Sequence, residues 1–151
     1  MIRTLIILTA FVLSTEALSY PDDKIEHLDS GKIFSDGDNL PFSEAVRVGN
    51  TIYLSGQIGI IPKSKKLISG GIKEETKQTL SNIKTILKAH GLTMNNVAKC
   101  TVMLADISEW PAFNEVYKEY FTSPYPARSA FAANGLAFGA RVEVDCIAIS
   151  H

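Results

Sequence analysis

The sequence lacks most of the features that would identify a function at once. It has only two cysteines and three histidines, and no pair of them has the spacing of metal ligands, so nothing supports a metal site. Its 15 basic and 16 acidic residues leave a formal charge of -1, with no surplus of positive charge for neutralising many phosphates. We therefore expect no nucleic-acid partner.

Common catalytic signatures are absent as well. The sequence has no P-loop, no GxGxxG, no HExxH and no Ser-His-Asp order. These absences count against NTPases, dinucleotide enzymes, zinc proteases and nucleophilic hydrolases. With 151 residues the chain is also too short for two ordinary domains.

The most hydrophobic part of the chain is its beginning. Arg3 precedes an apolar run over residues 5–13, and small and polar residues follow up to Ser19. This is the layout of a secretory signal peptide, because the run of about nine residues is much shorter than the ~20 that span a bilayer. We predict that residues 1–19 are a signal peptide, cut before Tyr20; an N-terminal core strand or helix is the alternative.

Cleavage there would leave residues 20–151 as one exported domain, secreted or periplasmic, with no membrane anchor. Export would allow Cys100 and Cys146 to pair. However, they are 46 residues apart and each lies within an apolar, strand-like run. We therefore expect two small buried hydrophobic side chains rather than a disulfide.

Hydrophobic periodicity predicts two helices among several strands. The first helix covers residues 72–90 and is stopped by Gly91; the second follows a cap at Asp106 or Ser108, carries an aromatic stripe and has Pro111 in its first turn. The predicted strands are 45–47 and 51–55, which form a hairpin, then 58–61, ending at a charged edge over 62–66, and finally 96–105, 127–133 and 141–150.

This order predicts an α+β fold with a mixed or mostly antiparallel sheet and two helices on one face. Two helices leave the other face uncovered, and the strands are apolar enough on both faces that we expect a second subunit to meet it. The chain is therefore predicted to form an oligomer.

Three short segments are candidates for chemistry. Arg128 begins a strand, where the residue type alone favours a surface or ion-paired arginine; the functional alternative is that its planar fork holds a carboxylate or phosphate. Glu143 and Asp145 share one strand face with apolar neighbours, which suits either a wet strand end or an acid-base group in a cavity. Ser55 and Gly56 lie at a strand end that a ligand could approach closely, or that forms a bulge.

The order and spacing of several motifs resemble the reactive intermediate deaminase A (RidA, YjgF-type) family over about residues 24–150. The matching segments are Leu40-Pro-Phe-Ser-Glu-Ala-Val46, Tyr53-Leu-Ser-Gly-Gln-Ile-Gly59, Gly70-Gly71-Ile72, Asn82-Ile83 with Leu87, Asn114 with Tyr117, Pro126-Ala-Arg-Ser129, Gly139-Ala-Arg-Val-Glu143 and Ile147-Ala148.

The resemblance implies a chorismate-mutase-like α+β fold and a homotrimer whose sheets form a central barrel, with active sites between subunits. It also implies hydrolysis of 2-imino acids, or their 2-enamino tautomers, such as 2-iminobutanoate and 2-iminopropanoate, to 2-oxo acids and ammonia. The family uses no metal and no organic cofactor.

The same resemblance implies roles for individual residues. Arg128 would clamp the substrate carboxylate, and Glu143 would position or deprotonate the attacking water. The substrate pocket would be lined by Phe42, Ser55, Gly56, Asn114 and Ala130. Phe42 stands where the best-studied branch has tyrosine, and Ala130 where it has cysteine, so we expect activity with an altered rate or substrate preference.

Two other functions remain open at this stage. A secreted trimer could bind small carboxylates, or act in a chaperone-like way, without catalysis. An endoribonuclease is the other, because relatives carry that label. The near-neutral charge and the absence of a histidine pair count against it.

Overall fold

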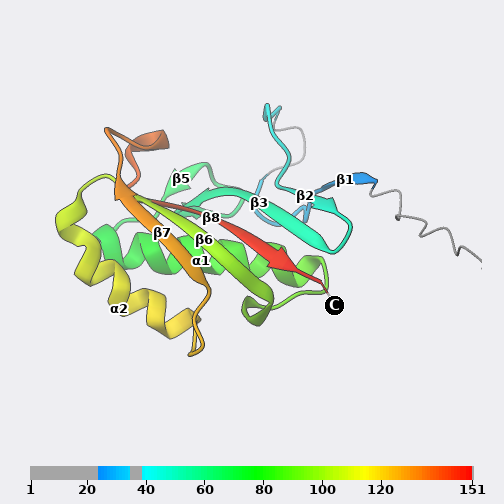
Figure 1. Cartoon of the computed structure of the whole chain (residues 1–151). Helices are drawn as coiled ribbons and strands as arrows, with labels where there is room; N and C mark the ends of the chain where they lie inside the picture. Colours follow the sequence, from blue (N-terminus) through cyan, green and yellow to red (C-terminus); the bar gives the residue numbers. More distant parts are fainter. Residues whose placement is uncertain (1–23, 35–38, 151) are drawn as a thin grey trace, which may run out of the picture.

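The computed structural model describes residues 24–34 and 39–150, which form a sheet carrying two long helices (Figure 1). The elements are β1 (Ile25–Leu28), β2 (Ala45–Val48), β3 (Thr51–Ile58), β4 (Ile60–Ile61), β5 (Lys66–Leu67), α1 (Gly71–Ala89), η1 (Met94–Asn96), β6 (Val97–Leu104), η2 (Ile107–Glu109), α2 (Trp110–Tyr120), β7 (Ala127–Ala132), η3 (Ala137–Gly139) and β8 (Val142–Ile149). The signal peptide predicted for residues 1–19 lies outside the described residues. Within the described ranges, no helix is long and apolar enough to cross a membrane.

Six strands form one mixed sheet in the order β1-β2-β3-β8-β6-β7. Every neighbouring pair is antiparallel except β6 and β7, which are parallel and are joined through α2. Both helices lie on the same face of this sheet (Figure 1). The predicted α+β architecture is thereby confirmed.

The helices pack against the sheet through the apolar residues that recur at helical spacing in the sequence. Leu80, Ile83 and Ile86 of α1 are at most 1% exposed, and Gly91, at φ 77°, ends the helix. Asp106 accepts a hydrogen bond from the Ser108 backbone N–H at 2.8 Å and so caps η2, directly before α2.

The side chains of strand β8 alternate between the two faces of the sheet. Val142, Val144 and Cys146 are buried on the helix side, whereas Glu143 and Asp145 alternate with them and are only half-buried. The face that Glu143 shares also carries Tyr53 and Phe131, each 48% exposed. Large apolar side chains on this face of the sheet are thus open to solvent in the single chain.

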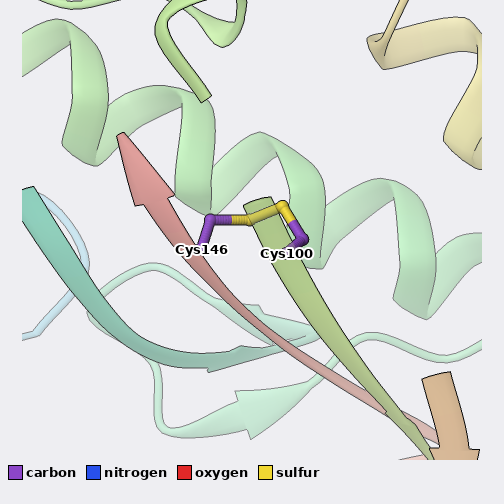
Figure 2. The surroundings of a disulfide bond; sticks show 2 residues. All are labelled: Cys100 and Cys146. Atoms are coloured by element: carbon purple, nitrogen blue, oxygen red, sulfur yellow. A yellow bond between two sulfur atoms is a disulfide. The ribbon is translucent and has the colours of Figure 1, made fainter. Parts of the chain in front are cut away.

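Cys100 and Cys146 form a disulfide beneath α1 (Figure 2). They are direct partners in the antiparallel register of β6 and β8, and both are buried. The prediction of two unpaired cysteines is therefore wrong. The strand containing each cysteine was recognisable, but the register that sets them opposite each other arises from tertiary pairing.

Two further predictions need correction. The strand predicted over residues 58–61 is interrupted at Gly59, between β3 and β4. A Cβ at Gly59 would lie 2.9 Å from the Glu75 Cα of α1, so the close approach of the helix requires glycine there. Residues 62–65 are the turn of a small β4–β5 hairpin rather than a charged sheet edge. Strand β1 was not predicted, since its four residues are mostly exposed and are held only by pairing with β2.

Candidate functional site

Glu143 lies in the larger of two pockets that contain predicted site residues. This Glu143 pocket has a volume of about 390 Å³. Its lining is mostly apolar and consists of Phe34, Asn39, Leu40, Phe42, Gly56, Gln57, Ile58, Ile60, Lys65, Ala137, Phe138 and Glu143. Three of the predicted residues, Phe42, Gly56 and Glu143, are therefore brought together.

A bulge in β3 makes space for the Glu143 carboxylate. The β3–β8 register shifts between Leu54 and Gln57, and Gly56 lies within that shift. A Cβ at Gly56 would overlap the Glu143 carboxylate, so the glycine is required by close approach. The bulge and the acid form one structural unit.

The environment of Glu143 favours its protonated form. Burial raises the pKa of the Glu143 carboxyl above its ordinary value, and the nearby negative charge of Asp145 raises it further. A carboxylate with a raised pKa is a stronger base than one free in water. Glu143 is thus suited to accept a proton from water.

Buried polar residues of α1 hold the backbone around this pocket. The Asn82 amide donates to the carbonyls of Ile58 at 3.2 Å and Ile60 at 2.9 Å, across the break at Gly59. The Glu75 carboxylate accepts from the Arg141 backbone N–H at 2.8 Å, next to the start of β8. Asn82 belongs to a motif of the family resemblance, but neither that motif nor the sequence around Glu75 predicts these contacts.

Ser55 supports the pocket without lining it. Its hydroxyl donates to the Ser43 carbonyl at 2.7 Å, and its backbone N–H donates to the Glu44 carbonyl at 3.0 Å. These bonds fix the segment that carries Phe42 against β3. The structure thus places Ser55 behind the pocket wall, not among the residues that line it.

Arg128 lies in a second pocket of about 290 Å³, lined by Asn114, Tyr117, Lys118, Tyr125, Pro126 and Arg128. This Arg128 pocket contains two basic side chains and no acidic one. The structure thereby brings Arg128 and Asn114 together. Ala130 lines neither pocket and lies beside Val102 in the β6–β7 register.

Three aromatic rings of α2, here called the aromatic bed, lie against the Arg128 guanidinium. Its Cζ lies 4.6 Å from the ring centroid of Tyr117, 5.2 Å from that of Trp110 and 5.7 Å from that of Phe113. Within the described part of the chain, Arg128 has no ion-pair partner. A cation held by ring faces keeps its N–H groups available for a carboxylate.

Tyr117 is the most buried polar member of this aromatic bed. Burial raises the pKa of its hydroxyl, and the positive charge of Arg128 opposes that shift. The hydroxyl has no hydrogen-bond partner among the described residues. The predicted aromatic stripe is thus more than core, because it positions Arg128.

The two pockets open on opposite faces of the sheet. Arg128 neighbours Cys100 in register and shares its helix-facing side, whereas Glu143 is out of phase with the buried Val142 and Val144. A single chain therefore does not bring Arg128 and Glu143 into one cavity. In the described ranges there is also no group of three or more His, Cys, Asp or Glu side chains that could hold a metal ion.

Comparison with known proteins identifies the family of this chain. Residues 38–150 match the model of the family described as Endoribonuclease L-PSP. The human 2-iminobutanoate/2-iminopropanoate deaminase is 51% identical over 109 residues, which cover 72% of this chain and 80% of that protein.

Two solved structures show the same fold. RidA from the Antarctic bacterium Psychrobacter sp. PAMC 21119 gives a TM-score of 0.77 at 36% identity, covering 83% of this chain and 99% of that one. E. coli TdcF with bound serine gives 0.72 at 27% identity, covering 82% and 97%. The chain belongs to the Endoribonuclease L-PSP family, which includes the RidA deaminases.

Proposed function

We propose that this chain hydrolyses 2-imino acids, such as 2-iminobutanoate and 2-iminopropanoate, to 2-oxo acids and ammonia. The observation that carries the proposal is Arg128, a cation on an aromatic bed with no acidic residue in its pocket. Such a group is suited to one small carboxylate. The name and the 51% identity of the human relative support the same reaction.

The chemistry requires one water and one proton acceptor. Arg128 binds the substrate carboxylate through two parallel hydrogen bonds and orients the imine carbon. Glu143 accepts a proton from water as the water oxygen bonds to that carbon and the C=N double bond becomes single. Glu143 returns this proton to nitrogen, which gives a carbinolamine with a hydroxyl and an NH2 group on the same carbon. Glu143 then takes the hydroxyl proton and delivers it to the same nitrogen, so that the C–N bond breaks, NH3 leaves and the oxygen forms the C=O of the 2-oxo acid.

The opposite orientation of Arg128 and Glu143 supports an active site between subunits. One subunit would supply the Arg128 pocket and its neighbour the Glu143 pocket. The open sheet face with Tyr53 and Phe131 is an apolar surface that a symmetric oligomer would bury. We therefore propose a homotrimer, as the family resemblance implies.

The disulfide supports export of the protein. Disulfides persist in oxidising compartments and are rare where glutathione and thioredoxin keep thiols reduced. Cys100 and Cys146 pair inside the core, so the bond must form as the chain folds. A signal peptide over residues 1–19 would deliver the chain to an oxidising compartment before it folds. We propose a secreted or periplasmic enzyme.

The direct test generates 2-iminobutanoate in situ and follows its loss. The protein is expected to accelerate hydrolysis, Arg128→Ala to weaken substrate binding severely, and Glu143→Gln to lower kcat. Lys84→Ala is a control, because Lys84 lies on the exposed side of α1 and lines neither pocket. No acceleration by the unmodified protein would overturn the proposal.

Ribonuclease activity is the function that the family description suggests instead. The charge of -1 gives little attraction for a polyanion. The same preparations are incubated with single-stranded RNA, and we expect no cleavage that depends on Arg128 or Glu143. Cleavage lost in both variants would favour the ribonuclease.

A further inference from the structure

The Glu143 pocket is larger than the reacting atoms of a small imino acid require. Its volume of about 390 Å³ falls within the ~300–1,000 Å³ of pockets that enclose whole small-molecule ligands. Catalysis needs only the imine carbon, its nitrogen and one water beside Glu143. In the single chain, a methyl or ethyl side chain would leave most of this volume unfilled.

Most of the remaining wall of the pocket is suited to hydrocarbon, although Asn39 and Lys65 also line it. Phe34 and Phe42 meet edge to face, with 6.2 Å between ring centroids. Ile58 and Ile60 add aliphatic surface. Gln57 lines the same pocket, but it is buried and its amide donates to the Ser55 carbonyl at 3.2 Å, so it does not need a polar ligand.

Phe138 lies at this pocket in an unfavourable conformation. Its backbone φ is 59°, a region that bulky residues avoid, and its side chain is 74% exposed, the highest value among the large apolar side chains described. Neither packing within the single chain nor backbone preference explains a phenylalanine here. Such a strained residue at a pocket indicates a role in ligand contact.

The substituents of the imine carbon determine which part of the substrate can occupy the apolar part of the Glu143 pocket. The imine carbon has three substituents: the carboxylate, which Arg128 of a neighbouring subunit would bind; the nitrogen, which Glu143 serves with a proton; and the side chain. Once the first two are placed, the side chain is the group left for the apolar part of the Glu143 pocket.

Resting on the proposed deaminase function, we propose that Phe34, Phe42 and Phe138 form a specificity pocket for the substrate side chain. The preferred substrates are 2-imino acids with large apolar side chains, those derived from leucine, methionine or phenylalanine. An added methylene in a well-fitting apolar pocket changes kcat/KM by about 10-fold or more. The leucine-derived imine is therefore expected to exceed 2-iminopropanoate by at least about tenfold in kcat/KM.

The experiment forms each imine in situ from its amino acid with a flavin-dependent amino acid oxidase and catalase. Imine loss is then measured for the alanine, 2-aminobutyrate, leucine and phenylalanine derivatives. A higher kcat/KM for the two bulky imines supports the pocket. An equal or higher value for 2-iminopropanoate overturns it and leaves the deaminase function intact.

Phe138→Asn tests the pocket in a variant that keeps the fold. Asparagine tolerates a positive φ, so the substitution removes the ring without adding backbone strain. We expect kcat/KM for the leucine-derived imine to fall about tenfold, with the 2-iminopropanoate value changed by less than about twofold. The control is Ile25→Asn, an exposed apolar residue on β1 outside both pockets. Unchanged selectivity in Phe138→Asn would contradict the role of this ring.

A binding measurement separates the pocket from the reaction. Trp110 is the one tryptophan of the chain and its ring lies 5.2 Å from the Arg128 Cζ, so its fluorescence should report a bound carboxylate. We expect 4-methyl-2-oxopentanoate to bind at least about tenfold more tightly than pyruvate. If no imine is hydrolysed, the deaminase function fails, but tighter binding of 4-methyl-2-oxopentanoate still supports the specificity pocket. Equal affinities for the two 2-oxo acids overturn the specificity pocket, whatever the activity.

Discussion

The side chains of Glu143 and Arg128 lie on opposite faces of one sheet. This follows from the register of three neighbouring strands. Arg128 of β7 pairs with Cys100 of β6, and β6 pairs in turn with β8, which carries Glu143. In the single chain the two groups therefore do not face one cavity. The proposed deamination, with Arg128 as carboxylate clamp and Glu143 as base, thus requires a second subunit to complete each site.

Reduction of the Cys100–Cys146 disulfide is expected to destabilise the protein. The bond closes a loop with a sequence separation of 46, for which chain entropy predicts a loss of about 4 kcal/mol in the free energy of unfolding. Urea unfolding with and without dithiothreitol, at one protein concentration, measures this loss. The Cys100→Ala/Cys146→Ala double variant should not respond to the reductant. Two thiols that react with maleimide in the denatured, unreduced protein would contradict the bond.

The charge of Glu143 is expected to lower stability at neutral pH. The pKa of Glu143 is raised in the folded protein, so the folded state binds its proton more tightly than the unfolded state does. Stability therefore falls as pH rises from the unfolded value near 4.5 through the raised folded pKa, and the loss persists above it. Glu143→Gln, which removes this charge, should be more stable than the unmodified protein at pH 7 and similar to it below about pH 4.

Asp145 provides the control for this pH dependence. Its negative charge contributes to the raised pKa of Glu143, so Asp145→Asn should lower that pKa. We expect the gain in stability from Glu143→Gln to shrink in the Asp145→Asn background, and the acidic limb of kcat/KM to move to lower pH. An acidic limb unaffected by Asp145→Asn would show that Glu143 is not the titrating base.

Tyr117 is expected to act through its ring and not through its hydroxyl. Since the buried hydroxyl has no partner among the described residues, Tyr117→Phe should leave the free energy of unfolding unchanged or raise it. Tyr117→Leu removes a ring face from Arg128, and a cation–π contact contributes ~0.5–2 kcal/mol. Titration with 2-oxobutanoate should show weaker binding for Tyr117→Leu alone, and equal weakening in both variants would contradict the role of the ring.

The parts of the fold that sequence predicts are those with local signals. Helix α1 follows from its apolar stripe and from Gly91, and β6 and β8 follow from their apolar runs. Strand β1 has no such pattern, because pairing with β2 alone defines it. The disulfide was missed for a related reason, since cross-strand register depends on the whole sheet.

The candidate site was predictable by residue type but not by arrangement. Arg128 and Glu143 were singled out by charge, strand position and family resemblance, yet their opposite faces emerge only from the β6–β7 and β6–β8 registers. Phe138 lies in a loop with no periodic pattern, so only the structure places it at the Glu143 pocket.

Mixing two inactive variants tests the shared active site most directly. Arg128→Ala keeps Glu143 and Glu143→Gln keeps Arg128, so each alone should be nearly inactive on 2-iminobutanoate. If each site combines Arg128 of one subunit with Glu143 of its neighbour, unfolding and refolding them together at equal amounts should restore about a quarter of unmodified activity, because random trimers contain intact sites in that proportion. The individually refolded variants, mixed without subunit exchange, are the control. Recovery near a quarter is the predicted result, and no recovery from well-formed mixed trimers would contradict an active site built from two subunits.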